Sequence, residues 1–151
     1  MDRHAASRDA ARRRLGQARQ QTNSNTVIVV AGPPCSGKTT YVRTHAARGD
    51  VTIDFDAIAV SLGSVEQWNH SPLLQSVAHA AQDASIARFQ ATDTNVTMWV
   101  IVTDPAQAQQ YGLANARLIT MDTEPDECER RAVALGRTQA VINVIRSYGN
   151  H

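Results

Sequence analysis

Apolar residues along the chain gather in short runs rich in β-branched side chains, and helix-forming segments separate these runs. The clearest runs cover residues 26–31 and 97–103, and neither shows the polar alternation of a half-exposed strand. Uninterrupted runs of this kind are typical of strands buried on both faces of a parallel sheet. Shorter apolar runs at 50–54 and 117–121 predict two more strands of the same sheet.

Helices are predicted between the strands. A long helix begins at Ser71, which suits the N-cap position because Pro72 follows at the first helical position. We expect its buried stripe to consist of Leu73, Leu74, Val77, Ala78, Ala81, Ala84 and Phe89. The other predicted helices cover residues 38–48, 56–62, 105–110 and 124–135, with a last one around 141–145. This alternation predicts an α/β fold in which helices cover both faces of a parallel sheet of four or five strands.

One segment carries a recognisable phosphate-binding pattern. Residues 32–39 read Gly-Pro-Pro-Cys-Ser-Gly-Lys-Thr, which is the P-loop or Walker A pattern, between a predicted strand and a predicted helix. Its two glycines let the backbone turn N–H groups toward a phosphate chain. Lys38, the only lysine of the chain, can follow the β- and γ-phosphates, and the hydroxyl of Thr39 can bind Mg²⁺.

The motif sharpens the fold class to a three-layer P-loop NTPase fold and implies ATP and Mg²⁺ as cofactors. The candidate nucleotide-binding residues are Gly32, Pro33, Pro34, Cys35, Ser36, Gly37, Lys38, Thr39 and Thr40.

Carboxylates follow the other predicted strands, at the edge of the sheet where such folds bind ligands. Asp104 ends an apolar strand, as a Walker B acid that holds Mg²⁺ does, although it also suits the N-cap of the next helix. Asp54 and Asp56 follow the second strand, and Asp122 follows the fourth. One acid of the Asp54–Asp56 pair is a candidate base, while an N-cap stays open as the alternative for Asp56 and a loop acid outside the direct contacts of the site as the alternative for Asp54. The predicted metal residues are Thr39, Asp54 and Asp104.

Charge is unevenly distributed, and this bears on partners. Residues 1–24 carry six arginines and two aspartates, a net charge of +4, whereas the remainder carries nine cations and twelve anions, a net charge of −3. We expect a basic extension over 1–25 and one domain over 26–151. The extension is either a solvated tail or an arginine arm that contacts nucleic-acid phosphates.

Cysteine content and hydropathy exclude several protein classes. Cys35 and Cys128 are too few for a disulfide framework and are expected to be reduced thiols. The chain has no transmembrane run, and its N-terminus lacks the apolar core of a signal peptide. A cytoplasmic protein without a membrane partner is therefore expected.

With these segments in place, the chain resembles the kinase domain of bacteriophage polynucleotide 5′-kinase and related small phage P-loop kinases. The matching stretches are 32–40, 51–62, 100–112 and 116–148. The resemblance implies that Asp56 is the general base, that Lys38 and Thr39 serve phosphate and magnesium, and that Asp104 is the acid after the third strand. It also implies that Arg131 and Arg137 belong to a lid over the transferring phosphoryl group. For Arg130 and Arg131, a solvated helix face paired with Glu127 is the alternative.

The identity of the acceptor stays open at this point. The family has a cation shortly after the catalytic aspartate, but residues 56–59 read Asp-Ala-Ile-Ala. The candidates are a polynucleotide 5′-hydroxyl end, a hydroxymethylated base in phage-type DNA, and a nucleoside or other small-molecule hydroxyl. Trp68, near His70 and His79, is either a stacking partner for a base or a partly buried side chain.

An accessory nucleic-acid-binding ATPase is the alternative of another class. Such a protein would need a glutamate beside Asp104 to polarise water, and Thr103 and Pro105 stand there instead. The sequence therefore favours a phosphotransferase.

Overall fold

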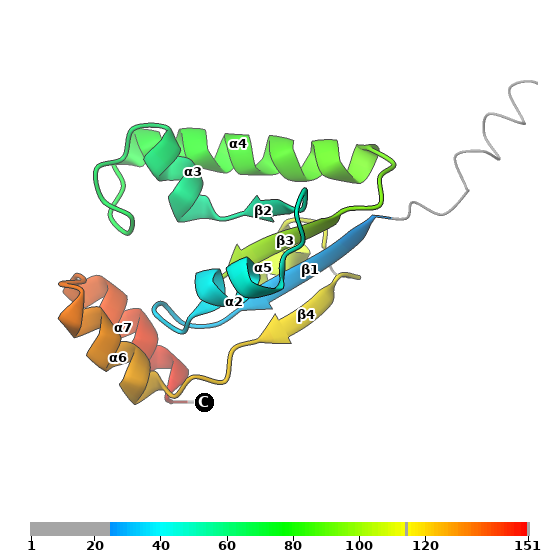
Figure 1. Ribbon diagram of the computed structural model, residues 1–151. Coiled ribbons are helices and arrows are strands. Elements are labelled where there is room, and N and C mark those ends of the chain that lie inside the picture. Colours follow the sequence, from blue (N-terminus) through cyan, green and yellow to red (C-terminus); the bar gives the residue numbers. More distant parts are fainter. Residues whose placement is uncertain (1–24, 114, 151) are drawn as a thin grey trace, which may run out of the picture.

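The computed structural model describes residues 25–113 and 115–150. Within them, four parallel strands form one sheet in the order β2-β3-β1-β4 (Figure 1). The strands are β1 (Thr26–Ala31), β2 (Val51–Ile53), β3 (Thr97–Val102) and β4 (Arg117–Thr120). The two longest apolar runs form the central strands β1 and β3. These strands pair along their whole length, from Thr26 opposite Thr97 to Ala31 opposite Val102. The predicted α/β class with a four-stranded parallel sheet is confirmed.

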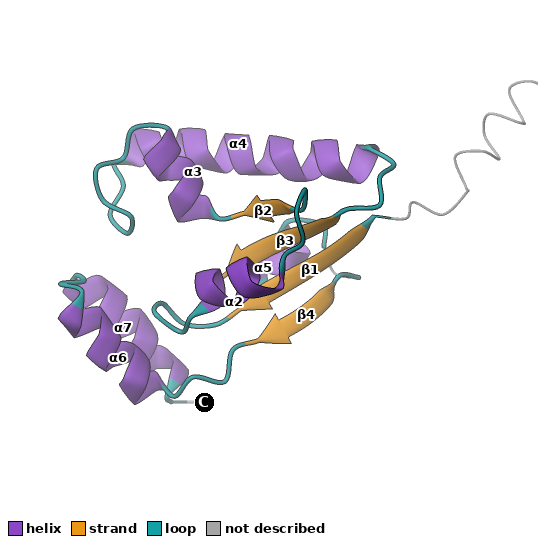
Figure 2. Cartoon of the chain, in the orientation of Figure 1, coloured by secondary structure: helices purple, strands orange, loops and turns teal. Residues whose placement is uncertain are grey.

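The helices lie in two layers and one separate pair (Figure 2). They are α2 (Lys38–His45), α3 (Phe55–Ser61), α4 (Pro72–Ala91), α5 (Gln107–Gln110), α6 (Pro125–Ala134) and α7 (Gln139–Tyr148). Helices α6 and α7 form a hairpin beyond the carboxyl ends of the strands (Figure 1). Cys128 and Ala132 of α6 pack against Ile142 and Ile145 of α7, which gives this pair an apolar core of its own.

Two hydrophobic clusters occupy the two faces of the sheet. On one face, Val29 and Val100 pack with Ile86 and Phe89 of α4. On the other face, Val30 packs with Val42 of α2 and with Trp99. Successive residues of a strand point to opposite faces, so Val29 and Val30 serve different clusters. Both faces are therefore covered, as the apolar character of the strands predicted.

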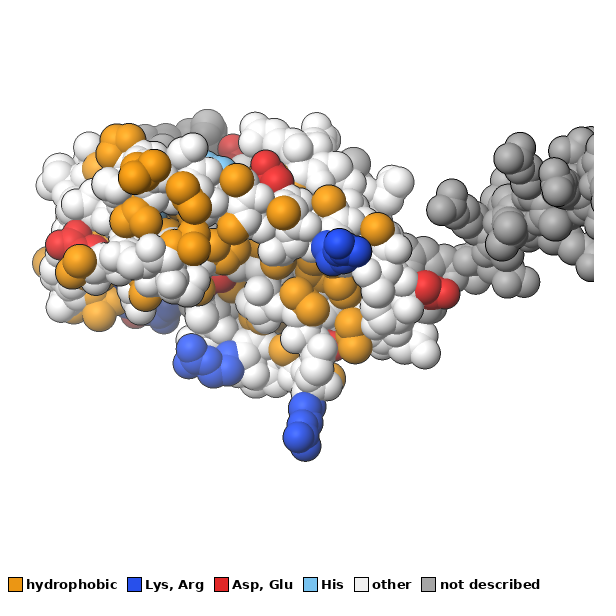
Figure 3. Space-filling view, turned by 90° about the horizontal axis from the view of Figure 1, so that it is seen from above, with side chains coloured by type: hydrophobic (Ala, Val, Ile, Leu, Met, Phe, Trp, Pro, Cys, Tyr) orange, Lys and Arg blue, Asp and Glu red, His pale blue; other side chains and the backbone are white. Residues whose placement is uncertain are grey.

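The expected stripe of α4 is wrong in part. The buried residues are Ala78, Gln82, Ile86 and Phe89, whereas Leu73 is 73% exposed and Val77 is 43% exposed, and Ala84 is exposed as well. Polar Gln82 takes a core position that a hydrophobic pattern cannot predict. The apolar side chains left outside gather on the α3–α4 side of the molecule, which Figure 3 shows from above.

Some element ends also differ from expectation. Helix α2 ends at His45 rather than Arg48, because Ala46 is already extended. The helix predicted over 105–110 is short and begins at Gln107. No helix in the described part of the chain is both long and apolar enough to span a membrane. The basic residues 1–24 lie outside the described residues, so the division into an extension and a domain stays a prediction.

Candidate active site

The phosphate loop joins β1 to α2 and has the backbone that its glycines permit. Gly37 is left-handed, with a φ of 92°, at the N-cap of α2. A Cβ atom at Gly32 would lie 2.8 Å from Oγ of Ser36 and 2.9 Å from Cβ of Met121, so only glycine fits there. No side chain caps α2. Its first N–H groups are therefore available to an anion at a helix N-terminus.

Lys38 folds back over this loop. Its Nζ donates hydrogen bonds to the carbonyl oxygens of Gly32, at 2.5 Å, and Pro33, at 3.0 Å. Burial lowers the pKa of Lys38 to about 8, and the negative charges of Asp54 and Asp56 partly oppose that shift. Phosphate oxygens would offer the ammonium group the charge partner that the carbonyls do not.

An unsatisfied hydroxyl marks the same loop. The side chain of Ser36 is 2% exposed, and its Oγ has no hydrogen-bond partner among the described residues. Buried polar atoms are normally paired, so this unpaired hydroxyl suits a ligand that offers it a hydrogen-bonding oxygen. The loop residues Gly32 to Thr40 therefore fit the phosphate chain of a nucleotide.

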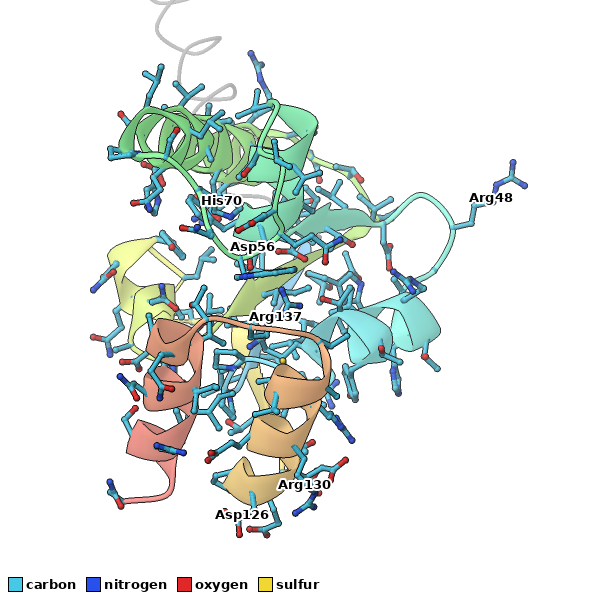
Figure 4. The ribbon with its side chains drawn as sticks, turned by 90° about the vertical axis from the view of Figure 1, so that its left-hand side faces the viewer. Arg48, Asp56, His70, Asp126, Arg130 and Arg137 are labelled. Carbon is cyan, nitrogen blue, oxygen red and sulfur yellow. The ribbon has the colours of Figure 1, made fainter. Side chains whose placement is uncertain are left out.

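The two acids after β2 have different positions. Asp54 is the N-cap of α3, and its carboxylate accepts hydrogen bonds from the backbone N–H groups of Asp56 and Ala57. Burial, followed by the charge of Asp56, raises the pKa of Asp54. Because Asp54 does the capping, the N-cap alternative considered for Asp56 is wrong. The Asp56 side chain is 55% exposed and points toward His70 and Arg137 at the carboxyl edge of the sheet (Figure 4).

Asp56 ends a chain of hydrogen bonds that sequence reasoning missed. Nε2 of His70 lies 2.7 Å from Oδ1 of Asp56. Nδ1 of the same ring lies 2.6 Å from Oγ of Ser64, which in turn lies 3.1 Å from the carbonyl oxygen of Glu66. His70 and Asp56 stand fourteen residues apart in no recognisable pattern. No sequence signal could have paired them, although His70 does fall in the segment expected to flank the acceptor.

The lid arginines come from α6 and the turn after it. Arg131 donates from Nη1 to the carbonyl oxygen of Cys35, at 3.1 Å, and so lies against the phosphate loop. The guanidinium carbon of Arg137 lies 3.9 Å from the centre of the Trp68 ring. Arg130 pairs with Glu127 and is directed away from Asp56 (Figure 4). Arg131 also donates from Nε to Oε1 of Glu127 at 3.0 Å, so the expected pairing with Glu127 is found for both arginines, and of the two only Arg131 also contacts the loop.

Asp104 stands at the end of β3 in a tight turn. Its Oδ1 accepts a hydrogen bond from the N–H of Ala106 at 2.9 Å, and the N-cap of α5 is Ala106 itself. Oε1 of Gln107 accepts from the N–H groups of both Thr103 and Asp104. The turn therefore fixes the acid in a position where the residue is exposed.

The metal residues Thr39, Asp54 and Asp104 stay predictions. Within the described ranges, no group of three His, Cys, Asp or Glu side chains could hold a metal ion. Mg²⁺ in phosphoryl-transfer sites is usually held by one or two carboxylates together with substrate phosphates and water. The hydroxyl of Thr39 and the carboxylates of Asp54 and Asp104 are enough for a site in which phosphates and water supply the other ligands.

A groove of about 420 Å³ opens beside the phosphate loop, between α2, α3 and the sheet. Thr39 and Arg43 line it from α2, and Asp54 lines it from the end of β2. Ala57 and Ile58 of α3 form the facing wall. A ligand in this groove would approach the phosphate loop from the side of the two acids.

A family model described as an AAA domain matches residues 27–146. The chain belongs to the AAA domain family. A chain from the solved structure titled "Structure of Pnkp1/Rnl/Hen1 complex" matches this AAA domain with a TM-score of 0.55 and 17% sequence identity. The match covers 71% of the present chain and only 38% of that chain. No curated protein matches the sequence significantly.

These findings support the earlier resemblance at the level of fold. The similarity to the solved structure shows a shared architecture, and the family match places the phosphate loop in a P-loop domain. The AAA domain described here is thus a nucleotide-binding P-loop domain.

Proposed function

We propose that the protein is an ATP- and Mg²⁺-dependent kinase that transfers the γ-phosphoryl group to an alcohol. One observation carries this proposal: the exposed carboxylate of Asp56 faces the edge of the sheet at which the phosphate loop opens. Its negative charge acts on buried Lys38, which indicates that the two groups are near each other. A carboxylate beside a bound triphosphate is the arrangement that a kinase needs to accept a hydroxyl proton.

Each site residue has a role in the proposed reaction. The acceptor oxygen forms a bond to the γ-phosphorus as its proton passes to Asp56, and the bond to the leaving ADP oxygen breaks. Lys38, Arg131 and Arg137 bind phosphate oxygens and stabilise the charge that develops on them. Bound Mg²⁺, held by Thr39 with Asp104 or Asp54, would neutralise the β- and γ-phosphate oxygens.

A polynucleotide is the acceptor that we favour, either at a 5′-hydroxyl end or at a hydroxymethylated base in DNA. The cation missing from residues 57–59 has a substitute on another element. Arg43 of α2 lines the same groove as Ala57 and Ile58, so positive charge reaches this side of the site. An arginine there suits an acceptor that carries its own phosphate. The arginines of residues 1–24 would add contacts to a longer strand.

A nucleoside or other small molecule is the second candidate acceptor. Ala59, in the segment where a cation is expected, is fully buried and cannot be approached by a ligand. The apolar side chains of Val42, Ile58 and Ile101 line much of the groove. These apolar walls suit the ring of a small molecule as well as they suit the terminal base of a polynucleotide.

Transfer of labelled γ-phosphate tests the proposal. The acceptors are 5′-hydroxyl oligonucleotides, hydroxymethylated duplex DNA and nucleosides, each with ATP and Mg²⁺. We expect Asp56→Asn to abolish transfer while ATP binding is retained, because the amide cannot take the proton. Asp126→Asn is the matched control, since Asp126 is an exposed acid far from the site (Figure 4). Release of phosphate with no labelled acceptor would favour an accessory ATPase and refute the kinase.

A further inference from the structure

The hydrogen-bonded chain that ends at Asp56 contains the residue types of a hydrolase triad, but in the opposite orientation. Ser64 and His70 are buried, at 7% and 9% exposure, whereas the Asp56 side chain is 55% exposed. A nucleophilic serine must be reached by its substrate, and Ser64 is at the inner end. The accessible group is the carboxylate, so the chain serves Asp56.

One arrangement of protons makes all three contacts hydrogen bonds. The carbonyl oxygen of Glu66 can only accept, so its 3.1 Å contact with Oγ of Ser64 is a hydrogen bond when Ser64 donates its single hydroxyl proton there. Oγ of Ser64 must then accept from Nδ1–H of His70. With Nδ1 protonated, the contact between Nε2 and an ionised Asp56 requires a second proton on the ring. All three contacts are satisfied together when His70 is an imidazolium ion that donates to Ser64 and Asp56.

The position of the His70 ring is fixed by its surroundings. The backbone carbonyl oxygen of His70 accepts a hydrogen bond from Nε2 of Gln75 at 3.0 Å, and the next residue, Ser71, caps α4. The ring of Phe55 meets it edge-on, with 5.8 Å between centroids. Phe55 immediately precedes Asp56 on α3, so the start of α3 and the start of α4 are held together at this point.

We propose that His70 is the positioning residue of the general base, an inference that rests on the proposed kinase function. His70 binds Oδ1 of Asp56 and prevents the carboxylate from rotating. Oδ2 then remains as the oxygen that takes the proton of the acceptor hydroxyl, while the hydrogen bond from Nε2 to Oδ1 stays in place. Ser64 keeps His70 in this orientation by accepting from its other nitrogen.

Nitrogen NMR of the full chain tests the proton arrangement without ATP or acceptor. The chain has five histidines, so loss of one ring signal in His70→Gln identifies His70. We expect His70 to show two slowly exchanging ring N–H protons. Asp56→Asn should shift the Nε2–H signal, and Ser64→Ala should expose the Nδ1–H proton to exchange. An unprotonated Nδ1 would show that Ser64 donates to the ring, and this would overturn the arrangement.

Kinetics tests the positioning role. Residues that orient metal ligands through a hydrogen bond typically contribute about 10–100-fold in activity, and we take the same range for a residue that orients a carboxylate base. We therefore expect His70→Ala to lower kcat by about that factor while KM for ATP changes little. His70→Gln should recover much of the loss, because its amide N–H can still donate to Asp56. His79→Ala is the control. His79 lies on α4, and its ring also packs against Phe55, with 4.4 Å between ring centroids.

The outcomes separate this inference from the function on which it rests. If Asp56→Asn abolishes transfer and His70→Ala leaves kcat unchanged, the positioning role is wrong and the kinase stands. If transfer survives Asp56→Asn, the assigned base itself is wrong. Thermal unfolding of each variant, together with its affinity for ATP, shows whether a loss of kcat reflects misfolding. If His70→Ala does not fold, kcat of His70→Gln is compared with kcat of Ser64→Ala. An equal loss of kcat in both variants would contradict rescue by the glutamine amide.

Discussion

At the scale of single residues, the site separates side chains that are close in sequence. Asp54 and Asp56 are two residues apart, yet Asp54 caps α3 while Asp56 is free of capping and meets His70. Arg130 and Arg131 are adjacent, yet only Arg131 contacts the phosphate loop. In each pair the neighbouring side chains point in different directions, so that only Asp56 meets His70 and only Arg131 reaches the phosphate loop.

Lys38 gives the site a pH dependence with a defined sign. Burial lowers its pKa from 10.5 to about 8. In the unfolded chain the lysine binds its proton more tightly, so its unfavourable contribution to stability is largest below pH 8 and is relieved as the pH rises from about 8 toward 10.5. Phosphate oxygens would favour the charged ammonium and raise this pKa again.

Binding of ATP should therefore take up a proton in the alkaline range. We expect uptake to be small at pH 7 and to approach one proton near pH 9, where Lys38 of the free protein has mostly lost its charge. Calorimetry in buffers of different ionisation enthalpy measures this number directly. Uptake that does not change between pH 7 and pH 9 would mean that Lys38 does not meet the phosphates.

Arg43 offers a test of the acceptor. If it binds a phosphate of a polynucleotide, Arg43→Ala removes a charged hydrogen bond of about 1.5–3 kcal/mol. KM for an oligonucleotide should then rise by roughly tenfold or more, while KM for ATP and for a nucleoside stays the same. Arg48→Ala is the matched control, because Arg48 projects away from the site on the loop after α2 (Figure 4). Equal effects of the two substitutions on KM would show that only the overall charge matters, and this would contradict a phosphate contact of Arg43.

At the scale of elements, two segments meet over the site. Trp68 belongs to the connection between α3 and α4, and Arg137 belongs to the turn between α6 and α7. Their cation–π contact, at 3.9 Å, is the link between the two segments. Contacts of this type contribute from about 0.5–1 kcal/mol at exposed sites to about 2 kcal/mol when desolvated. Trp68 and Arg137 are both half-buried, and the charged oxygens of a phosphate can compete for the guanidinium.

We expect ATP to draw Arg137 away from Trp68 and to change tryptophan fluorescence. The chain has two tryptophans, and Trp99 is buried in the core. Titration of wild type with ATP should therefore give a signal that Trp68→Phe abolishes and Arg137→Ala strongly reduces, with ATP affinity lowered in the arginine variant. A signal that survives in Trp68→Phe would come from Trp99 and would contradict movement of the lid.

Sequence predicted the elements better than the contacts between them. β-branched runs and the glycine-rich loop identified β1, β3 and the start of α2, because burial and backbone geometry leave few alternatives there. The stripe of α4 was misjudged because Gln82 is buried and Leu73 is not. The pairing of Trp68 with Arg137 depends on how the sheet brings distant connections together, which no local pattern records.

At the scale of the whole molecule, charge divides the chain into two parts. The first 24 residues carry a net charge of +4 and the rest carry −3, so a nucleic acid would be attracted by the extension and repelled by much of the domain. Removing the extension should therefore weaken nucleic-acid binding, and we expect the domain predicted over residues 26–151 to fold without it.

Deletion of residues 1–22 tests this separation. Six arginines leave with the segment. If all six contact duplex DNA, the slope of log affinity against log salt falls by up to about 5, since each phosphate contact contributes about 0.9. The melting temperature and ATP affinity should stay the same, and transfer to a nucleoside should be unaffected while KM for an oligonucleotide rises. An unchanged salt slope would show that the extension is only a tail, and Arg43 would then have to supply most of the attraction for a polynucleotide acceptor.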